Sequence, residues 1–266
     1  MCFTPIDKNY GVKHHKRQSL FSSARRAQRR EHLLHPGHGV GGITGWRRWL
    51  ANILLIIFVA PPVMFIGYRY IPPFITPLMI IRSAEGFGLT RHWVPLSEIS
   101  PNLQRAVIAS EDARFCLHHG FDWVAVHKAI ERNAEGGHRL LGASTISMQT
   151  AKNLLLWPGR DYLRKGAEAY LTMWLEMFVP KKRILELYLN EIEWGQGIYG
   201  AEAAARIYFN TSAAKLTPRQ ASLMAAVLPN PLGWRPDYPG RWVSEHARTI
   251  EGRMNAVFLG KDGPCP

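Results

Sequence analysis

The chain has 266 residues, of which 47% are hydrophobic, and it carries a formal net charge of +13. This length and composition suit one globular domain with an appendage, or two small domains, and they exclude a disordered or fibrous protein. The positive charge predicts an anionic partner, such as a nucleic acid, an anionic membrane surface or an acidic ligand.

The first 48 residues form a basic arm without apolar periodicity, in which Asp7 and Glu31 are the only acids. We expect this arm to be disordered. A nucleic acid is one partner for it, but anionic lipid head groups are sufficient to explain its charge, so we expect no nucleic acid.

Residues 49–68, WLANILLIIFVAPPVMFIGY, contain no charged residue. About 20 apolar residues are enough to cross the hydrocarbon core of a bilayer, and membrane helices tolerate a kink such as Pro61 and Pro62 predict. A buried core helix is the alternative, but it has no need to be apolar on every face. The positive-inside rule places the arm in the cytoplasm and everything after Tyr70 outside, which in a bacterium is the periplasmic side of the inner membrane.

Residues 69–84 are a proline-rich, membrane-proximal connector, and from about Leu96 the sequence is a run of helical patterns with almost no strand signal. Asp122 is a candidate helix cap, and Thr217 with Gln220 a candidate capping box. We place a catalytic domain at 85–258 and a tail at 259–266. The predicted helices lie near 101–116, 122–134, 145–155, 160–178, 181–192, 199–209, 217–228 and 243–258.

Three cysteines, Cys2, Cys116 and Cys265, form neither a disulfide framework nor a metal-binding spacing. A bridge between Cys116 and Cys265 is left open for an oxidising compartment. No spacing in the sequence predicts a metal site.

Glu111 and Asp112 stand side by side within a helical pattern. Leu103, Val107, Glu111 and Phe115 are spaced four apart and fall on one face of the predicted helix, so Glu111 interrupts an apolar row. It is either a partly exposed residue at the edge of the row or a carboxylate whose desolvation raises its pKa for use as a base.

The stretch GASTISMQTAKN, residues 142–153, leads small and hydroxyl residues into a helix, whose free NH groups favour an anion. Thr145, Gln149 and Lys152 follow at i, i+4 and i+7 on one face. An ordinary capped helix with a solvated lysine is the alternative.

In GRDYLRKGAEAYLTMWLE, residues 159–176, Arg164 and Lys165 lie four and three residues before Glu168. A surface salt bridge is one interpretation. The other is a second carboxylate held by two cations that also face an anionic ligand. Two acids, a helix N-terminus and several cations outside the membrane together predict sugar chemistry with a charged leaving group, which needs cations and not a proton donor.

These stretches resemble the peptidoglycan glycosyltransferases, family 51 of the glycosyltransferases. ASEDARFCLHHG is similar to the motif EDxxFxxHxG, GASTISMQTAKN to GxSTIxQQxxKN, and RKGAEAYLTMWLE to RKxxExxxxxxLE. Two later stretches, KKRILELYLNEIEWGQGIYGAEAAARIYF and LMAAVLPNP, resemble the fourth and fifth motifs. Met148 departs from the pattern where a glutamine often stands.

The resemblance implies a mainly α, lysozyme-like, two-lobed glycosyltransferase domain preceded by one transmembrane helix. It implies that lipid II and the growing glycan chain are joined with inversion and release of polyprenyl diphosphate. Glu111 corresponds to the general base, Glu168 to a second essential carboxylate, and His119 is expected at the motif's histidine in a packing role. The implied substrate-binding residues are Asp112, Ser144, Thr145, Gln149, Lys152, Asn153, Arg164 and Lys165.

Metal dependence varies in the family, so a divalent cation (Mg²⁺ or Mn²⁺) near the pyrophosphate stays open. Because no long segment follows residue 258, we expect no transpeptidase activity. Cell-wall synthesis or division proteins are further expected partners. The alternatives are a lysozyme-like hydrolase or lytic transglycosylase, which needs no cationic clamp, and a non-catalytic membrane-anchored scaffold, which gives no reason for Glu111 in its apolar row.

Overall fold

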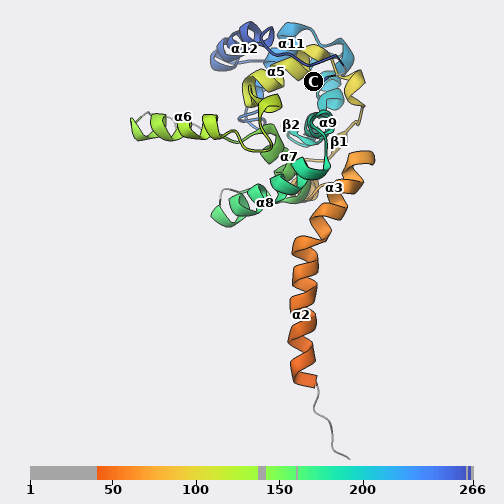
Figure 1. The fold of residues 1–266 in the computed structure, drawn as a ribbon. Coiled ribbons are helices and arrows are strands. Elements are labelled where there is room, and N and C mark those ends of the chain that lie inside the picture. The colour runs from red at the N-terminus through yellow and green to blue at the C-terminus, as the bar shows by residue number, and fades with distance from the viewer. Residues whose placement is uncertain (1–40, 137–141, 160, 262, 265–266) are drawn as a thin grey trace, which may run out of the picture. The chain divides into compact units, whose positions relative to one another are not determined.

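The computed structural model describes residues 41–136, 142–159, 161–261 and 263–264, without the side chains of 41–44 (Figure 1). The chain divides into two units, residues 1–54 and 55–266, and the motif stretches quoted above all lie in the second. The arm at 1–40, and with it Cys2, lies outside the described residues, as does Cys265.

The predicted membrane segment is helical. Helix α2 (Gly41–Phe58) and helix α3 (Ala60–Tyr70) are interrupted at Val59, where Pro61 and Pro62 enter the first turn of α3, because proline cannot donate the backbone hydrogen bond that would continue the helix. Within the described residues, Gly45–Tyr70 is the one helical stretch long and apolar enough to cross a membrane, slightly longer than the predicted 49–68. Most of its side chains are exposed.

The connector includes one short helix, α4 (Pro77–Ala84), which Thr76 caps by accepting a hydrogen bond from the Met79 amide. Met79 is buried, whereas Phe74 is 93% exposed. The connector thus combines a face packed on the domain with an apolar side chain left outside.

The domain is built from two groups of packed helices. Helices α5 (Pro101–Glu111), α11 (Pro218–Val227) and α12 (Arg241–Met254) pack on one another, and helices α7 (Ile146–Leu155), α8 (Tyr162–Phe178) and α9 (Lys181–Glu191) form the second group (Figure 1). Helix α6 (Trp123–Ala134) follows α5, and helix α10 (Ala201–Phe209) follows the strands described below. One apolar cluster runs through both groups, so the predicted mainly helical domain is confirmed.

Three short strands, which the sequence analysis missed, form one sheet in the order β1-β3-β2. β1 (Thr90–Arg91) pairs in parallel with β3 (Ile198–Tyr199), and β2 (Glu193–Gly195) pairs with β3 antiparallel. Gly197 turns the chain between β2 and β3 at φ 68°, and an added Cβ there would lie 2.2 Å from the Phe87 carbonyl oxygen. Only glycine suits this turn.

Several predicted helix boundaries are wrong. The helix predicted for 101–116 ends at Glu111, because Asp112 adopts φ −160° and ψ 72° and Phe115–Leu117 forms a separate 3-10 turn. The helix predicted for 243–258 ends at Met254. The caps at Asp122 and at Thr217 with Gln220 are confirmed. The remaining 3-10 turns are Leu96–Glu98 and Ala213–Lys215.

Candidate active site

Glu111 is the last residue of α5. Ser100 and Pro101 start this helix, and Leu103 and Val107 bury its apolar face in the core. Glu111 follows them on that row, half-buried, where the helix ends. Phe115 is buried as well, but from the 3-10 turn after the helix. The predicted apolar environment of Glu111 is therefore present, although its last member comes from another element.

A hydrogen-bonded pair of side chains holds Glu111. Gln149 in α7 donates from Nε2 to Oε2 of Glu111 at 2.8 Å, and the buried Tyr188 hydroxyl donates to Oε1 of Gln149 at 3.1 Å. Burial raises the pKa of Glu111 above its ordinary value, and Asp112 raises it further, while the bond from Gln149 and the charge of Lys152 oppose the shift. A raised pKa makes this carboxylate a stronger proton acceptor than an ordinary glutamate.

Asp112 organises the backbone around the site. Its carboxylate accepts a hydrogen bond from the Ile146 amide at 3.0 Å, at the start of α7, and lies 2.9 Å from Nε2 of His118. Asp112 and His118 are both buried. Asp112 therefore joins the end of α5 to the beginning of α7.

The expectation for His119 is wrong. His119 is exposed, and His118 is the histidine that packs inside. The 3-10 turn at Phe115–Leu117 brings His118 back against Asp112, and His118 is also the residue three positions after Phe115, as the motif EDxxFxxHxG requires.

The start of α7 is fixed by hydroxyl groups. Thr145 caps the helix, accepting a hydrogen bond from the Met148 amide at 3.2 Å and donating to the Gly120 carbonyl at 2.6 Å. Ser144 accepts a hydrogen bond from Nζ of Lys165 at 2.9 Å. The predicted face of Thr145, Gln149 and Lys152 is thus present on one helix.

The second predicted acid, Glu168, lies buried behind two cations. Arg164 Nη1 and Lys165 Nζ each lie 2.6 Å from its carboxylate oxygens. Burial lowers the pKa of Lys152, and Arg164 and Lys165 lower it as well, whereas Glu168 and Glu111 raise it. Both acids therefore act electrostatically on the same lysine.

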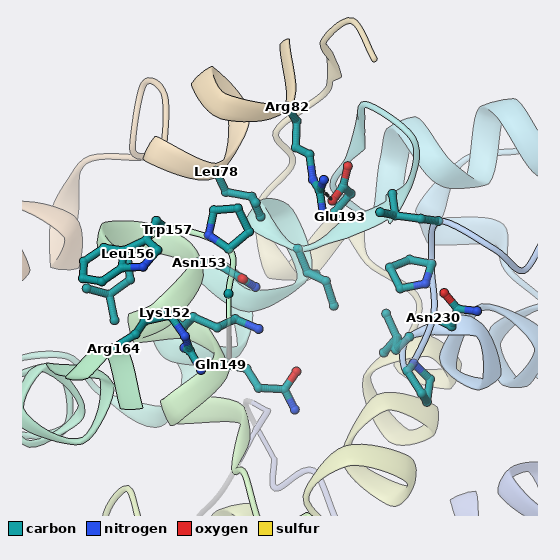
Figure 2. Close-up of a pocket in the computed structure, with 17 residues that line it drawn as sticks. Leu78, Arg82, Gln149, Lys152, Asn153, Leu156, Trp157, Arg164, Glu193 and Asn230 are labelled. Atoms are coloured by element: carbon teal, nitrogen blue, oxygen red, sulfur yellow. Dashed lines mark ion pairs between the residues drawn. The ribbon is translucent and has the colours of Figure 1, made fainter. Parts of the chain in front are cut away.

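Two of the three predicted cations, Lys152 and Arg164, line a cavity of about 410 Å³ (Figure 2). Gln149, Lys152 and Arg164 point into it from α7 and α8, with Asn153 beside them. Sequence reasoning missed the opposite wall, where Arg82 of α4 pairs with Glu193 of β2 at 3.4 Å. Glu193 lies within the fourth motif stretch, but nothing in the sequence connects it to Arg82. The fifth motif stretch contributes Leu228–Pro231 to the lining, and Leu232 follows it.

A second cavity, of about 280 Å³, includes Glu111 in its lining. Asp112, Ser144 and Thr145 lie around it, with Lys128 on a further wall. Gln149 lines the first cavity while it binds Glu111 at the second, so Glu111 lies where the two cavities adjoin.

Among the described residues, the acids near the two cavities are already engaged by other groups of the protein. Within the described part of the chain, Asp112, His118 and Asp122 bring ligand atoms within 4.8 Å of one another. However, Asp112 is already bound to the Ile146 amide and to His118, and Asp122 caps α6 and pairs with Arg114. Beside Lys152, the nearby Glu168 is held by two cations.

Comparison with known proteins gives one consistent family. The sequence model of the family described as Transglycosylase matches residues 80–258. A biosynthetic peptidoglycan transglycosylase of Caulobacter vibrioides is 54% identical over 215 residues, covering 79% of this chain and 93% of the relative. Proteins of the same description from Rhodospirillum centenum and Bdellovibrio bacteriovorus are 53% and 49% identical, over 81% and 78% of this chain and 93% and 85% of their own lengths.

Proposed function

Because the chain belongs to the transglycosylase family and is a peptidoglycan glycosyltransferase, we propose that its two adjoining cavities form the lipid II polymerisation site, with Glu111 as general base between them. The observation that carries this assignment is the position of Glu111, half-buried and linked by Gln149 to the cavity that contains Lys152 and Arg164.

The reaction joins an acceptor sugar hydroxyl to the anomeric carbon of the donor. The hydroxyl oxygen forms the new C–O bond as its proton passes to Glu111, and the bond from the anomeric carbon to the pyrophosphate oxygen breaks with inversion. A base with a raised pKa suits this transfer, because it accepts the proton as the hydroxyl becomes nucleophilic.

The departing pyrophosphate needs positive charge and no proton. Lys152 and Arg164 supply it from one wall of the larger cavity. Glu168 acts through the cations, since it holds Arg164 and Lys165, and Lys165 also binds Ser144. Asn153, Thr145 and Asp112 complete the proposed substrate-binding set, Asp112 by orienting the start of α7.

One N-terminal apolar helix indicates a single-pass membrane anchor. We infer that the basic arm is cytoplasmic and the domain periplasmic, where the lipid tail of the substrate stays in the bilayer beside the site. Cys116 is disulfide-bonded, which supports an oxidising compartment for the domain because disulfides persist there.

The purified chain, incubated with labelled lipid II in vesicles, tests the assignment. We expect polymer that lysozyme digests, together with release of polyprenyl diphosphate. A protein that instead shortens preformed glycan and leaves lipid II untouched would support the hydrolase interpretation and overturn the proposal.

A further inference from the structure

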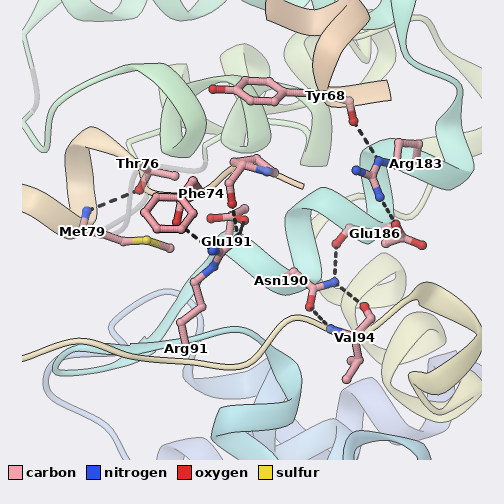
Figure 3. A network of polar contacts seen from close by, with 11 residues as sticks. Tyr68, Phe74, Thr76, Met79, Arg91, Val94, Arg183, Glu186, Asn190 and Glu191 are labelled. Carbon is pink, nitrogen blue, oxygen red and sulfur yellow. Dashed lines mark hydrogen bonds and ion pairs between the residues drawn. The ribbon is translucent and has the colours of Figure 1, made fainter. Parts of the chain in front are cut away.

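Two arginines bind backbone carbonyl groups where the chain leaves the candidate span (Figure 3). Arg91 in β1 donates to the Phe74 oxygen at 2.9 Å and to the Pro73 oxygen at 2.6 Å. Arg183 in α9 donates from Nε to the Tyr68 oxygen at 2.8 Å. Side chains of the catalytic domain therefore hold the end of helix α3 and the connector that follows it.

Both arginines also form ion pairs with acids of helix α9. Glu191, at the C-terminal end of α9, is buried and forms a short ion pair with Arg91. Glu186, one turn earlier, pairs with Arg183. The guanidinium carbons of Arg91 and Arg183 lie 5.6 Å and 5.1 Å from the ring centroid of Trp93, so the two cations share one aromatic neighbour. The connector and α9 are held in one network.

Helix α9 also contacts the active site. Tyr188 lies two residues after Glu186, about 200° around the helix, but only three residues before Glu191, which is about 60° away, so Glu191 and Tyr188 leave α9 on nearly the same side. Tyr188 is fully buried, and α9 packs on α7, where the Tyr188 hydroxyl binds Gln149. Within one turn of α9, Tyr188 thus binds Gln149, the partner of Glu111, and Glu191 binds Arg91, which holds the connector.

We propose that Arg91 is a positioning residue, which couples the seating of the membrane anchor to Glu111 through α9 and the Tyr188–Gln149 bond. This inference rests on the proposed role of Glu111 as the base. When Arg91 releases the connector and Glu191, α9 shifts and Tyr188 no longer fixes the Gln149 amide. A misplacement of about 1 Å at a reacting group can cost about 10²-fold in rate.

The test uses the full chain in vesicles that contain lipid II. We expect Arg91→Ala to lower kcat by about 10-fold or more, within the range that misplacement causes, with KM unchanged. The acid limb of the pH–kcat profile moves to higher pH, because the Gln149 hydrogen bond lowers the pKa of Glu111. Arg91→Lys keeps the charge but not the planar fork, so it gives a smaller loss and a smaller shift in the same direction.

Arg69→Ala is the matched control. Arg69 lies in the last turn of α3, next to the connector, and its exposed side chain donates to the backbone carbonyl of Phe178 in α8 at 3.4 Å. We expect it to leave the acid limb in place. Unchanged kcat in Arg91→Ala, a rise in KM alone, or a lower kcat with an unmoved acid limb would each overturn the coupling.

Hydrogen exchange gives a readout that does not depend on turnover. We expect the amides around Tyr188 and Gln149 to exchange faster in Arg91→Ala and Arg91→Lys than in wild type, and unchanged exchange there would also overturn the coupling. If wild type polymerises no lipid II while this exchange difference is present, the proposed function fails and the mechanical link stands.

Discussion

Gln149 donates a 2.8 Å hydrogen bond to Glu111, and the amide of Gln149 is oriented for this by the hydroxyl of Tyr188 at its other end. Burial raises the pKa of Tyr188 well above its ordinary value, so the phenol stays protonated and acts as the donor. The amide oxygen then faces Tyr188, and the amide NH₂ group faces the carboxylate.

Replacing Gln149 with leucine should move the acid limb of the activity profile to higher pH. The variant loses the hydrogen bond that lowers the pKa of Glu111, so this pKa, already raised by burial, rises further. A base must be deprotonated, so activity disappears as pH falls through that pKa, and it disappears earlier in the variant. The measurement is kcat for lipid II polymerisation against pH, with Met148→Leu as the α7 control; identical acid limbs in wild type and Gln149→Leu would contradict it.

Removing either cation of the larger cavity, Lys152 or Arg164, should slow the departure of pyrophosphate. Loss of one group that stabilises developing charge typically costs about 10²–10³-fold, so we expect Lys152→Ala and Arg164→Ala each to lower turnover on that order. Arg206→Ala is the matched control, because Arg206 forms the same i, i+4 pair with Glu202 on α10 at 2.7 Å. Wild-type turnover in both Lys152→Ala and Arg164→Ala would favour the surface salt-bridge interpretation.

The two adjacent histidines should differ in their effect on stability. His118→Ala removes the imidazole that lies 2.9 Å from the buried carboxylate of Asp112. Leaving a buried polar group unsatisfied costs about 1–3 kcal/mol. His119 is exposed, so His119→Ala should leave the melting temperature near wild type. Thermal unfolding of the two variants side by side checks this, and equal melting temperatures would argue against the Asp112–His118 contact.

Stability should decline as the pH rises from about 4.5 to about 7, because of Glu191. Burial raises the pKa of Glu191 from 4.5 to about 7, although the positive charges of Arg91 and Arg183 lower it. Tyr68 also interacts electrostatically with Glu191. A raised folded-state pKa contributes stability that is full below pH 4.5 and lost as the pH rises through about 7. The shift corresponds to about 3 kcal/mol. Melting of Glu191→Gln at pH 5 and pH 8 should show a smaller difference than wild type; an equal difference would place the titration elsewhere.

Local patterns were sufficient to predict helix α7, its cap and the face that Gln149 and Lys152 share. Thr145 caps the helix and Gln149 and Lys152 share its face, because hydrogen bonding and 3.6-residue periodicity are both local. The end of α5 could not be predicted in this way. Phe115 continues the four-residue spacing, but Asp112 leaves the helix because its carboxylate binds the Ile146 amide, 34 residues away.

Contacts between distant segments account for the rest. Tyr188 lies 39 residues from Gln149, and Arg91 lies 100 residues from Glu191, so no periodicity connects either pair. The strands β1 and β3 have two residues each, too few for an alternating pattern to be recognised. Arg82 was missed because it reaches Glu193 only when α4 packs against the domain.

The central claim is that Glu111 accepts the proton of the attacking hydroxyl, and the most direct measurement is the rate of lipid II polymerisation by Glu111→Gln. Glutamine keeps the size and can still hydrogen-bond to Gln149, but it cannot accept the proton. A positioned base contributes about 10²–10⁴-fold, so we predict a rate lowered by at least about 10²-fold, with the melting temperature near wild type. A folded Glu111→Gln protein that keeps more than about a tenth of the wild-type rate would contradict the assignment, because a loss of less than about 10-fold is smaller than a positioned base contributes.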